Sequence, residues 1–158
     1  MLFDMAWESF TAQEWLESYI TARYGRYSES AQKAWKILND TVYSKPGWYR
    51  TSAQVMTLVP ENAGQQELPY DNADLQRALA LLLEDYDVLC VSEGYRYDLV
   101  ELMRQIVNNY SVEVYNEVYE AFQSYSVVEF NNLSQEFLST FDLMDEVLSC
   151  RSEWLAGE

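Results

Sequence analysis

The stretch LVELMRQIVNNYSVEVYNEVYEAF, residues 99–122, decides the fold class of this chain. Its apolar side chains recur at every third or fourth position, which is the 3.6-residue period of one face of an α-helix. No other periodic signal in the sequence is as strong. The stretch therefore predicts a long, central helix whose apolar face is formed by Leu99, Leu102, Met103, Ile106, Val107, Tyr110, Val114, Val118 and Phe122.

A pair of shorter helices is predicted before this stretch. The sequence Thr11-Ala12-Gln13-Glu14 has the form of a capping box, and Gly25 supplies a stop, so a first helix is expected over about residues 11–24. Ser28 can cap a second helix, which the sequence Ser44-Lys45-Pro46-Gly47 ends. The expected inward face of the second helix is Ala31, Ala34, Trp35, Leu38 and Val42.

Two further helices complete the prediction. Asp71 or Asn72 can cap one that runs to about Asp85, and its apolar stripe is Leu75, Leu79, Leu82 and Leu83. The other follows a short break near residues 124–126 and is built on Phe130, Leu133, Phe137, Leu138, Phe141, Met144, Val147 and Leu148. We therefore expect an all-α fold, an irregular antiparallel helical bundle of about five helices in a single domain over residues 1–158.

A long irregular connection separates the second and third helices. Helical periodicity disappears between residues 47 and 72, where prolines and glycines punctuate the chain. Ordered loops of this length are often functional. Trp48, Tyr49 and Tyr70 lie there beside proline or glycine, off any helical stripe, which makes them candidates to contact a ligand. Arg50 could donate to a hydroxyl or a carboxylate. Other aromatic residues fall on helical stripes and are predicted to pack in the core: Trp15, Trp35, Tyr110 and Phe137.

Composition excludes several functional classes. The 26 acidic and 10 basic residues give a formal net charge of −16, which repels nucleic acid and anionic membrane surfaces. No apolar run is long enough to span a bilayer, and the N-terminus lacks the features of a signal peptide. Cys90 and Cys150 lie far apart, so no metal site is expected; a disulfide between them is disfavoured, and Cys90 is predicted to be a buried thiol.

No catalytic residues can be assigned from the sequence. Histidine is absent, so the commonest general base at neutral pH is missing and no serine or cysteine nucleophile has an activating partner. Paired carboxylates could support glycoside hydrolysis, but in so acidic a chain they are expected to form solvated surface. The candidate clusters are Glu84, Asp85 and Asp87; Asp142, Asp145 and Glu146; and Glu61 with Glu67. No cofactor is expected.

A series of motifs runs along the chain from Thr11 to about Trp154. The most specific is Tyr95-Arg96-Tyr97-Asp98-Leu99-Val100-Glu101-Leu102 with Arg104-Gln105. The others are Trp15-Leu16 with Tyr19, Arg23-Tyr24-Gly25, Ala34-Trp35 with Leu38, Val42-Tyr43, and Pro69-Tyr70-Asp71-Asn72 before Leu75 and the helix over Leu79 to Leu83. In one order and with matching spacing, these motifs resemble the C-terminal domain of α-N-acetylglucosaminidases, family 89 of the glycoside hydrolases.

The resemblance implies a larger, retaining, exo-acting enzyme. In such enzymes a (β/α)8 barrel supplies two catalytic glutamates, and this helical domain packs beside the barrel and helps to wall the substrate cleft. No catalytic position carries over to this chain. Two parts of the family pattern carry over. One is the connection from Trp48 to Tyr70, which faces the barrel in the family. The other is the motif Arg96-Tyr97-Asp98, which we expect to be structural, with Arg96 and Asp98 in a buried or cap-like ion pair.

The sequence also departs from the family pattern. Tyr49-Arg50-Thr51-Ser52 stands where the family usually shows an Arg-Pro-Ser stretch, and the connection after Trp48 is shorter than in the family. The family continues through further helices after residues 151–155, so the resemblance implies a truncated domain with some uncovered apolar surface. It also implies a secreted, periplasmic or lysosomal parent whose signal lies on the missing N-terminal part.

Charge favours one class of glycan, and two alternative functions remain. A net charge of −16 disfavours a sulphated polyanion such as heparan, so neutral glycans that end in α-linked N-acetylglucosamine are the expected partners, together with the catalytic barrel. One alternative is an acidic, helical protein-interaction module that uses the long helix as its docking face. The other is an independent carbohydrate-binding module.

Overall fold

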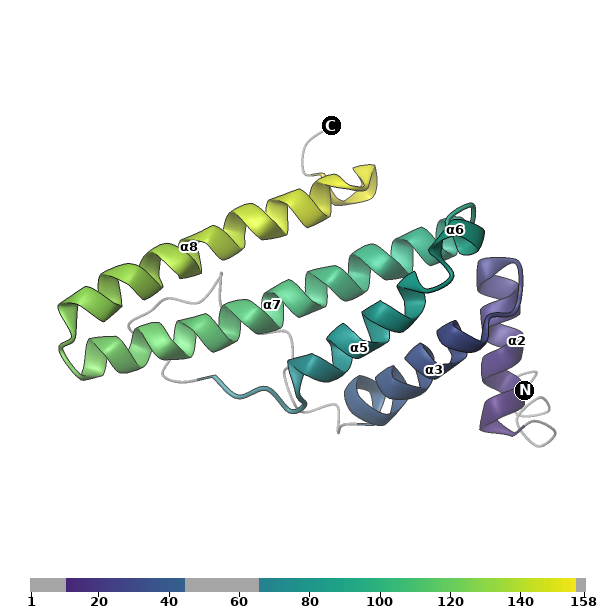
Figure 1. The fold of residues 1–158 in the computed structure, drawn as a ribbon, viewed down its shortest axis with the longest axis horizontal. Coiled ribbons are helices and arrows are strands. Elements are labelled where there is room, and N and C mark those ends of the chain that lie inside the picture. Colours follow the sequence, from purple (N-terminus) through teal and green to yellow (C-terminus); the bar gives the residue numbers. More distant parts are fainter. Residues whose placement is uncertain (1–10, 45–65, 156–158) are drawn as a thin grey trace, which may run out of the picture.

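The computed structural model describes residues 11–44 and 66–155, and over these ranges the chain is helical without strands, so the predicted all-α fold is confirmed (Figure 1). Trp48, Tyr49 and Arg50 lie outside the described residues. The elements are α2 (Ala12–Tyr24), α3 (Glu29–Leu38), the π-turn η1 (Asn39–Tyr43), α5 (Asn72–Leu83), the short α6 (Tyr86–Leu89), α7 (Glu93–Gln123), α8 (Val127–Ser149) and the 3-10 turn η3 (Ser152–Trp154).

Local capping sets the helix boundaries. Thr11 and Glu14 form the predicted capping box, in which the Glu14 amide donates to Thr11 Oγ1 at 3.2 Å and the Thr11 amide donates to Glu14 Oε2 at 2.8 Å. Gly25 ends α2 with φ of 80°, a left-handed conformation that costs glycine little. Ser28 caps α3, and of the two candidates for α5 it is Asp71 whose side chain caps the helix.

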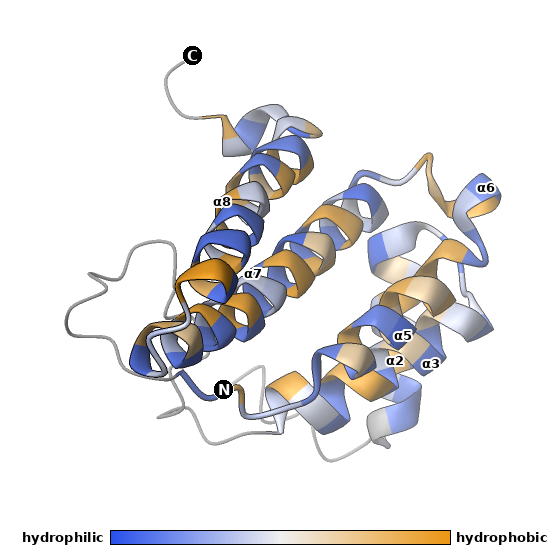
Figure 2. Cartoon of the chain, turned by 60° about the vertical axis from the view of Figure 1, so that its left-hand side comes forward, coloured by the Kyte–Doolittle hydropathy of each residue, from blue (hydrophilic) through white to orange (hydrophobic). Residues whose placement is uncertain are grey.

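The long helix organises the molecule. Helices α7 and α8 form an antiparallel hairpin, α2 and α5 pack against α7, and α3 packs against α5 and α2 (Figure 1). Figure 2 shows hydrophobic residues along both helices of the hairpin. The main core joins α2, α3, α5, α6 and α7, and it contains Ile20, Tyr24, Ala31, Ala34, Leu38, Tyr70, Leu75, Ala78, Leu82, Leu89, Tyr95, Leu99 and Leu102.

Gly94 allows a close approach between two elements of this core. A Cβ atom at Gly94 would lie 2.7 Å from the carbonyl oxygen of Arg23 and 2.9 Å from its Cγ. The start of α7 can therefore meet the end of α2 because residue 94 has no side chain. Ser92, which caps α7, also donates to the Arg23 carbonyl at 3.0 Å.

Several core predictions were wrong. Trp15 is 53% exposed and Tyr110 is 36% exposed, because in the described part of the chain their helix faces are only partly covered by neighbouring elements. Trp35 and Phe137 are partly buried.

The prediction that Cys90 is a buried thiol is also wrong, because Cys90 is partly exposed near the end of α6. Both Cys90 and Cys150 are free. Within the described ranges, no helix combines the length and apolar content needed to cross a membrane.

Candidate functional site

An ion pair joins the first helix to the long helix. Arg23 on α2 donates from Nε and Nη2 to the two carboxylate oxygens of Asp98 on α7, both at 2.6 Å. The Asp98 side chain is 11% exposed, and Arg23 is 32% exposed. This bidentate geometry is the strong form of a carboxylate–guanidinium pair. It connects residues that are 75 positions apart in the sequence.

The expected pairing of Arg96 with Asp98 is therefore wrong. The side chain of Arg96 points to the start of α7, where it pairs with Glu93 and donates to the carbonyl of Cys90 at 2.9 Å. Residues two positions apart on a helix do not share a face, which is why Arg96 and Asp98 reach different partners. Tyr97 lies between two cations, with Arg23 Cζ 5.9 Å and Arg151 Cζ 5.8 Å from its ring centroid.

A hydrogen-bonded chain extends from this ion pair to Trp35. Trp35 Nε1 donates to the hydroxyl oxygen of Tyr24 at 2.8 Å, and the Tyr24 hydroxyl donates to Asp98 Oδ2 at 3.0 Å. Burial and the negative charge of Asp98 raise the pKa of Tyr24 well above its usual range. Tyr24 therefore stays protonated and holds both bonds, which fixes the orientation of the Trp35 indole.

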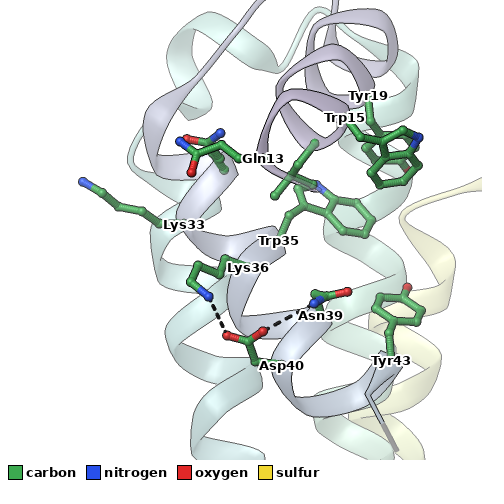
Figure 3. A pocket seen from close by; sticks show the side chains of 11 residues that line it. Gln13, Trp15, Tyr19, Lys33, Trp35, Lys36, Asn39, Asp40 and Tyr43 are labelled. Atoms are coloured by element: carbon green, nitrogen blue, oxygen red, sulfur yellow. Dashed lines mark hydrogen bonds and ion pairs between the residues drawn. The ribbon is translucent and has the colours of Figure 1, made fainter. Parts of the chain in front are cut away.

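Trp35 forms the centre of a surface that we call the aromatic groove, defined by Trp15, Tyr19, Trp35 and Tyr43. Trp15 stacks on Tyr19 with ring centroids 5.3 Å apart, and Tyr19 meets Trp35 edge to face at 5.1 Å. Trp35 stacks on Tyr43 at 6.4 Å. Figure 3 shows Trp35 between the Trp15–Tyr19 pair and Tyr43. The two outer rings are open to solvent, since Trp15 is 53% and Tyr43 is 66% exposed.

Polar side chains share this groove. It encloses a volume of about 580 Å³, which is within the usual range for a small-molecule site. Two lysines and one aspartate lie along it, and Lys36 donates to Asp40 at 2.9 Å (Figure 3). Asn39 donates to the other oxygen of Asp40 at 3.3 Å. The complete polar lining is Gln13, Gln32, Lys33, Lys36, Asn39 and Asp40.

The described chain stops at Ser44, next to Tyr43 of this groove, and resumes at Gln66, which contacts α7. The Asn116 side chain accepts from the Gln66 amide and donates to the Gln66 carbonyl, both at 2.8 Å. The returning end is therefore held to α7 by a two-point amide clamp.

Tyr70, a predicted ligand contact, lies in the core and is 8% exposed. Burial raises the pKa of Tyr70, while the nearby amides of Asn109 and Gln105 act in the opposite direction. Beside it, Asn109 donates to Asn72 Oδ1 at 3.1 Å, so the residues that follow the connection are fixed by buried amide contacts. In the structure Tyr70 anchors the returning end of the connection.

In the part of the chain that the structure describes, the clustered carboxylates other than Asp85 are exposed, and Glu61 lies outside that part. Asp85 accepts from the hydroxyls of Ser28 and Ser30 at 2.7 Å, and these bonds lower its pKa, so it stabilises the start of α3. Asp142 and Asp145 lie exposed on α8. Among the described residues, no group of three or more histidines, cysteines or carboxylates is arranged to hold a metal ion.

Sequence reasoning missed the aromatic groove. It placed Trp15 and Trp35 on apolar helical stripes and assigned them to the core. Two sequence signals could have revealed the groove: the spacing of four between Trp15 and Tyr19, and the position of Tyr43 at the start of the irregular connection.

Residues 11–44 and 66–155 thus form an all-α fold that carries the aromatic groove on its surface. The chain belongs to the family described as the alpha-N-acetylglucosaminidase (NAGLU) C-terminal domain, whose model matches residues 15–158. The resemblance found in the sequence is thereby confirmed. The chain is 30% identical over 149 residues to human alpha-N-acetylglucosaminidase, and the match covers 90% of this chain and 20% of the relative.

Solved structures agree with this assignment. A family 89 glycoside hydrolase from Clostridium perfringens, in complex with 2-acetamido-1,2-dideoxynojirmycin, superposes with a TM-score of 0.78 at 28% identity, and the match covers 96% of this chain and 18% of that chain. The same organism's enzyme in complex with its substrate GlcNAc-alpha-1,4-galactose gives a TM-score of 0.77 at 26% identity over 94% of this chain and 18% of that chain. The chain therefore spans about a fifth of the length of these relatives.

Proposed function

We propose that this chain is the accessory helical domain of an exo-acting α-N-acetylglucosaminidase, that it packs on a catalytic barrel, and that it lines one side of the glycan cleft without supplying catalytic residues. The observation that carries the proposal is the family match over residues 15–158 combined with a coverage of only about a fifth of the relatives. The described carboxylates support it, because Asp85 is engaged in helix capping and those on α8 lie on an exposed surface.

The connection between η1 and α5 is the part of the chain that we assign to the cleft. Trp48, Tyr49 and Arg50 would contact the glycan by stacking and by hydrogen bonding. Tyr70 belongs to the same segment, and its burial gives that segment a fixed base. The Asn116 clamp on Gln66 supports this division of roles, because it holds the end of a segment that has to be positioned against a ligand.

In this proposal, the negative net charge of the chain determines which class of glycan is favoured. A net charge of −16 on one wall of the cleft raises the free energy of bringing a sulphated polyanion near it. A neutral glycan with a terminal α-linked N-acetylglucosamine carries no such cost. We therefore infer a preference for neutral, mucin-type chains over heparan-derived ones.

The test uses the protein encoded by the complete reading frame. That protein should contain a barrel with two suitably placed glutamates and should hydrolyse a chromogenic α-N-acetylglucosaminide. Trp48→Ala should raise KM for a neutral disaccharide about tenfold, which equals about 1.4 kcal/mol of lost binding. Tyr125→Ala is the matched control, since Tyr125 is 90% exposed at the turn between α7 and α8.

Three results would contradict the proposal. An upstream sequence that encodes no such barrel removes the enzyme assignment. Equal KM values for Trp48→Ala and the unsubstituted protein remove the cleft assignment. Equal turnover of heparan-derived and neutral oligosaccharides removes the charge argument.

A further inference from the structure

The geometry points to the aromatic groove as a saccharide-binding site that holds a neutral pyranose unit by itself, without any contribution from a catalytic barrel. This goes beyond the lining of a cleft, because it concerns α2, α3 and η1 and a binding activity of the chain alone. It does not rest on the function proposed above.

The aromatic rings of the groove are arranged so that a pyranose ring can pack on them. One face of a pyranose presents axial C–H groups, and such an apolar face packs on flat rings. Trp15 and Tyr43 offer accessible rings at the two ends of the groove, and Trp35 lies between them. Tyr19 turns its edge to Trp35 at an interplanar angle of 83°, so the rings line the walls of a trough rather than form a flat stack.

Polar lining is the second argument. A sugar also has a rim of hydroxyl groups, each of which can donate and accept a hydrogen bond. The groove supplies amides from Gln13, Gln32 and Asn39, which offer both donors and acceptors, together with the Lys36–Asp40 pair. Each of these groups already has a hydrogen bond within the chain, since Gln13 and Gln32 donate to Glu17 and Asn39 and Lys36 donate to Asp40. Each also keeps further donor or acceptor capacity, which a saccharide rim would use and an apolar protein segment would not.

Local charge is the third argument. The chain as a whole is strongly acidic, yet two lysines and only one aspartate line the groove. Lys36 pairs with Asp40, and Lys33 pairs with Glu29 at 2.8 Å on the same helix. The local charges are therefore balanced, which suits a neutral ligand better than a polyanion or a cation.

The central ring of the groove is held in place before any ligand binds. The indole nitrogen of Trp35 is fixed by Tyr24, and Tyr24 is fixed by Asp98 in its bidentate pair with Arg23. A ring that keeps its orientation loses little side-chain entropy on binding, which strengthens association. Tyr24 is thus a positioning residue, because it acts through Trp35.

The experiment is a titration of this chain with GlcNAc-α-1,4-galactose, followed by isothermal titration calorimetry and by tryptophan fluorescence. Saturable binding is expected, with a Kd of roughly a millimolar or tighter. Trp15→Ala and Tyr43→Ala should each weaken binding about tenfold, which corresponds to about 1.4 kcal/mol. Both side chains are more than half exposed, so the fold should survive. Tyr125→Ala is the control and should bind like the unsubstituted chain.

A second variant separates positioning from folding. Tyr24→Phe keeps the buried ring but removes the acceptor for Trp35, so binding should weaken about threefold and the Trp35 indole N–H resonance should shift. A lack of saturation at roughly ten times a millimolar Kd would overturn the proposal. Unchanged binding in both Trp15→Ala and Tyr43→Ala would also overturn it, and binding of a sulphated disaccharide as tight as that of the neutral one would overturn the charge argument.

Discussion

Asp98 is the residue whose replacement tests the packing of the bundle most sharply. It accepts three hydrogen bonds from α2, two from Arg23 and one from Tyr24. In Asp98→Asn the side-chain oxygen can still accept, but the amide nitrogen faces the guanidinium, where a donor meets a donor. The charge attraction is lost as well, and Arg23 keeps its charge beside a partly buried surface.

The size of the expected stability loss depends on how deeply the Arg23–Asp98 pair is buried. Removing one partner of a fully buried ion pair costs about 3–5 kcal/mol, because the other charge remains without compensation. Arg23 is 32% exposed, so water recovers part of this cost. We expect Asp98→Asn to lower the free energy of unfolding by about 2–3 kcal/mol. For a domain of this size the midpoint of thermal unfolding should fall by about 5–10 °C.

Urea and thermal unfolding followed by far-UV circular dichroism measure this loss. Asp40→Asn is the control, because Asp40 forms an i,i+4 pair with Lys36 on an exposed helix face, and its midpoint should stay unchanged. An Asp98→Asn chain as stable as the unsubstituted chain would refute the argument that the Arg23–Asp98 pair ties α2 to α7. An equal loss in both variants would refute the argument from burial.

Two further changes test the fold. The pKa of Asp85 is lowered by the Ser28 and Ser30 hydroxyls, so its ionised form stabilises the folded state at pH values above its ordinary pKa of 3.8, and that contribution is lost as the pH falls through the lower folded-state value. Asp85→Asn should therefore cost about 1 kcal/mol at neutral pH, and the difference from the unsubstituted chain should shrink as the pH falls below 3.8; a constant difference in urea titrations would contradict this. Gly94→Ala should cost roughly 1–3 kcal/mol, because the added Cβ meets the Arg23 carbonyl at 2.7 Å, and an unchanged unfolding midpoint would disprove that contact.

Local signals in the sequence predicted the helices well. The capping box at Thr11, the stop at Gly25 and the cap at Ser28 are found where they were expected, because caps involve only neighbouring residues. The long stretch of helical periodicity over residues 99–122 lies within α7, which begins earlier, at Glu93. The short α6 and the π-turn η1 were not expected, because elements of four or five residues carry no measurable periodicity.

Contacts between residues on different helices could not be predicted from local sequence signals. Nothing in the local pattern links Asp98 to Arg23, since their meeting depends on how α2 packs against α7. Apolar periodicity also says which face of a helix is apolar but not whether that face is covered. Trp15 illustrates this limit, because its position on a stripe predicted burial and the structure leaves it 53% exposed as one wall of a groove.

In the function proposed here, this chain serves an α-N-acetylglucosaminidase without performing the chemistry itself. The most direct measurement is the hydrolysis of a chromogenic α-N-acetylglucosaminide by this chain and by the protein from the complete reading frame, side by side. We expect turnover by the complete protein and none by the chain alone. Turnover by the isolated chain, at a rate that Trp15→Ala or Asp98→Asn alters, would contradict it.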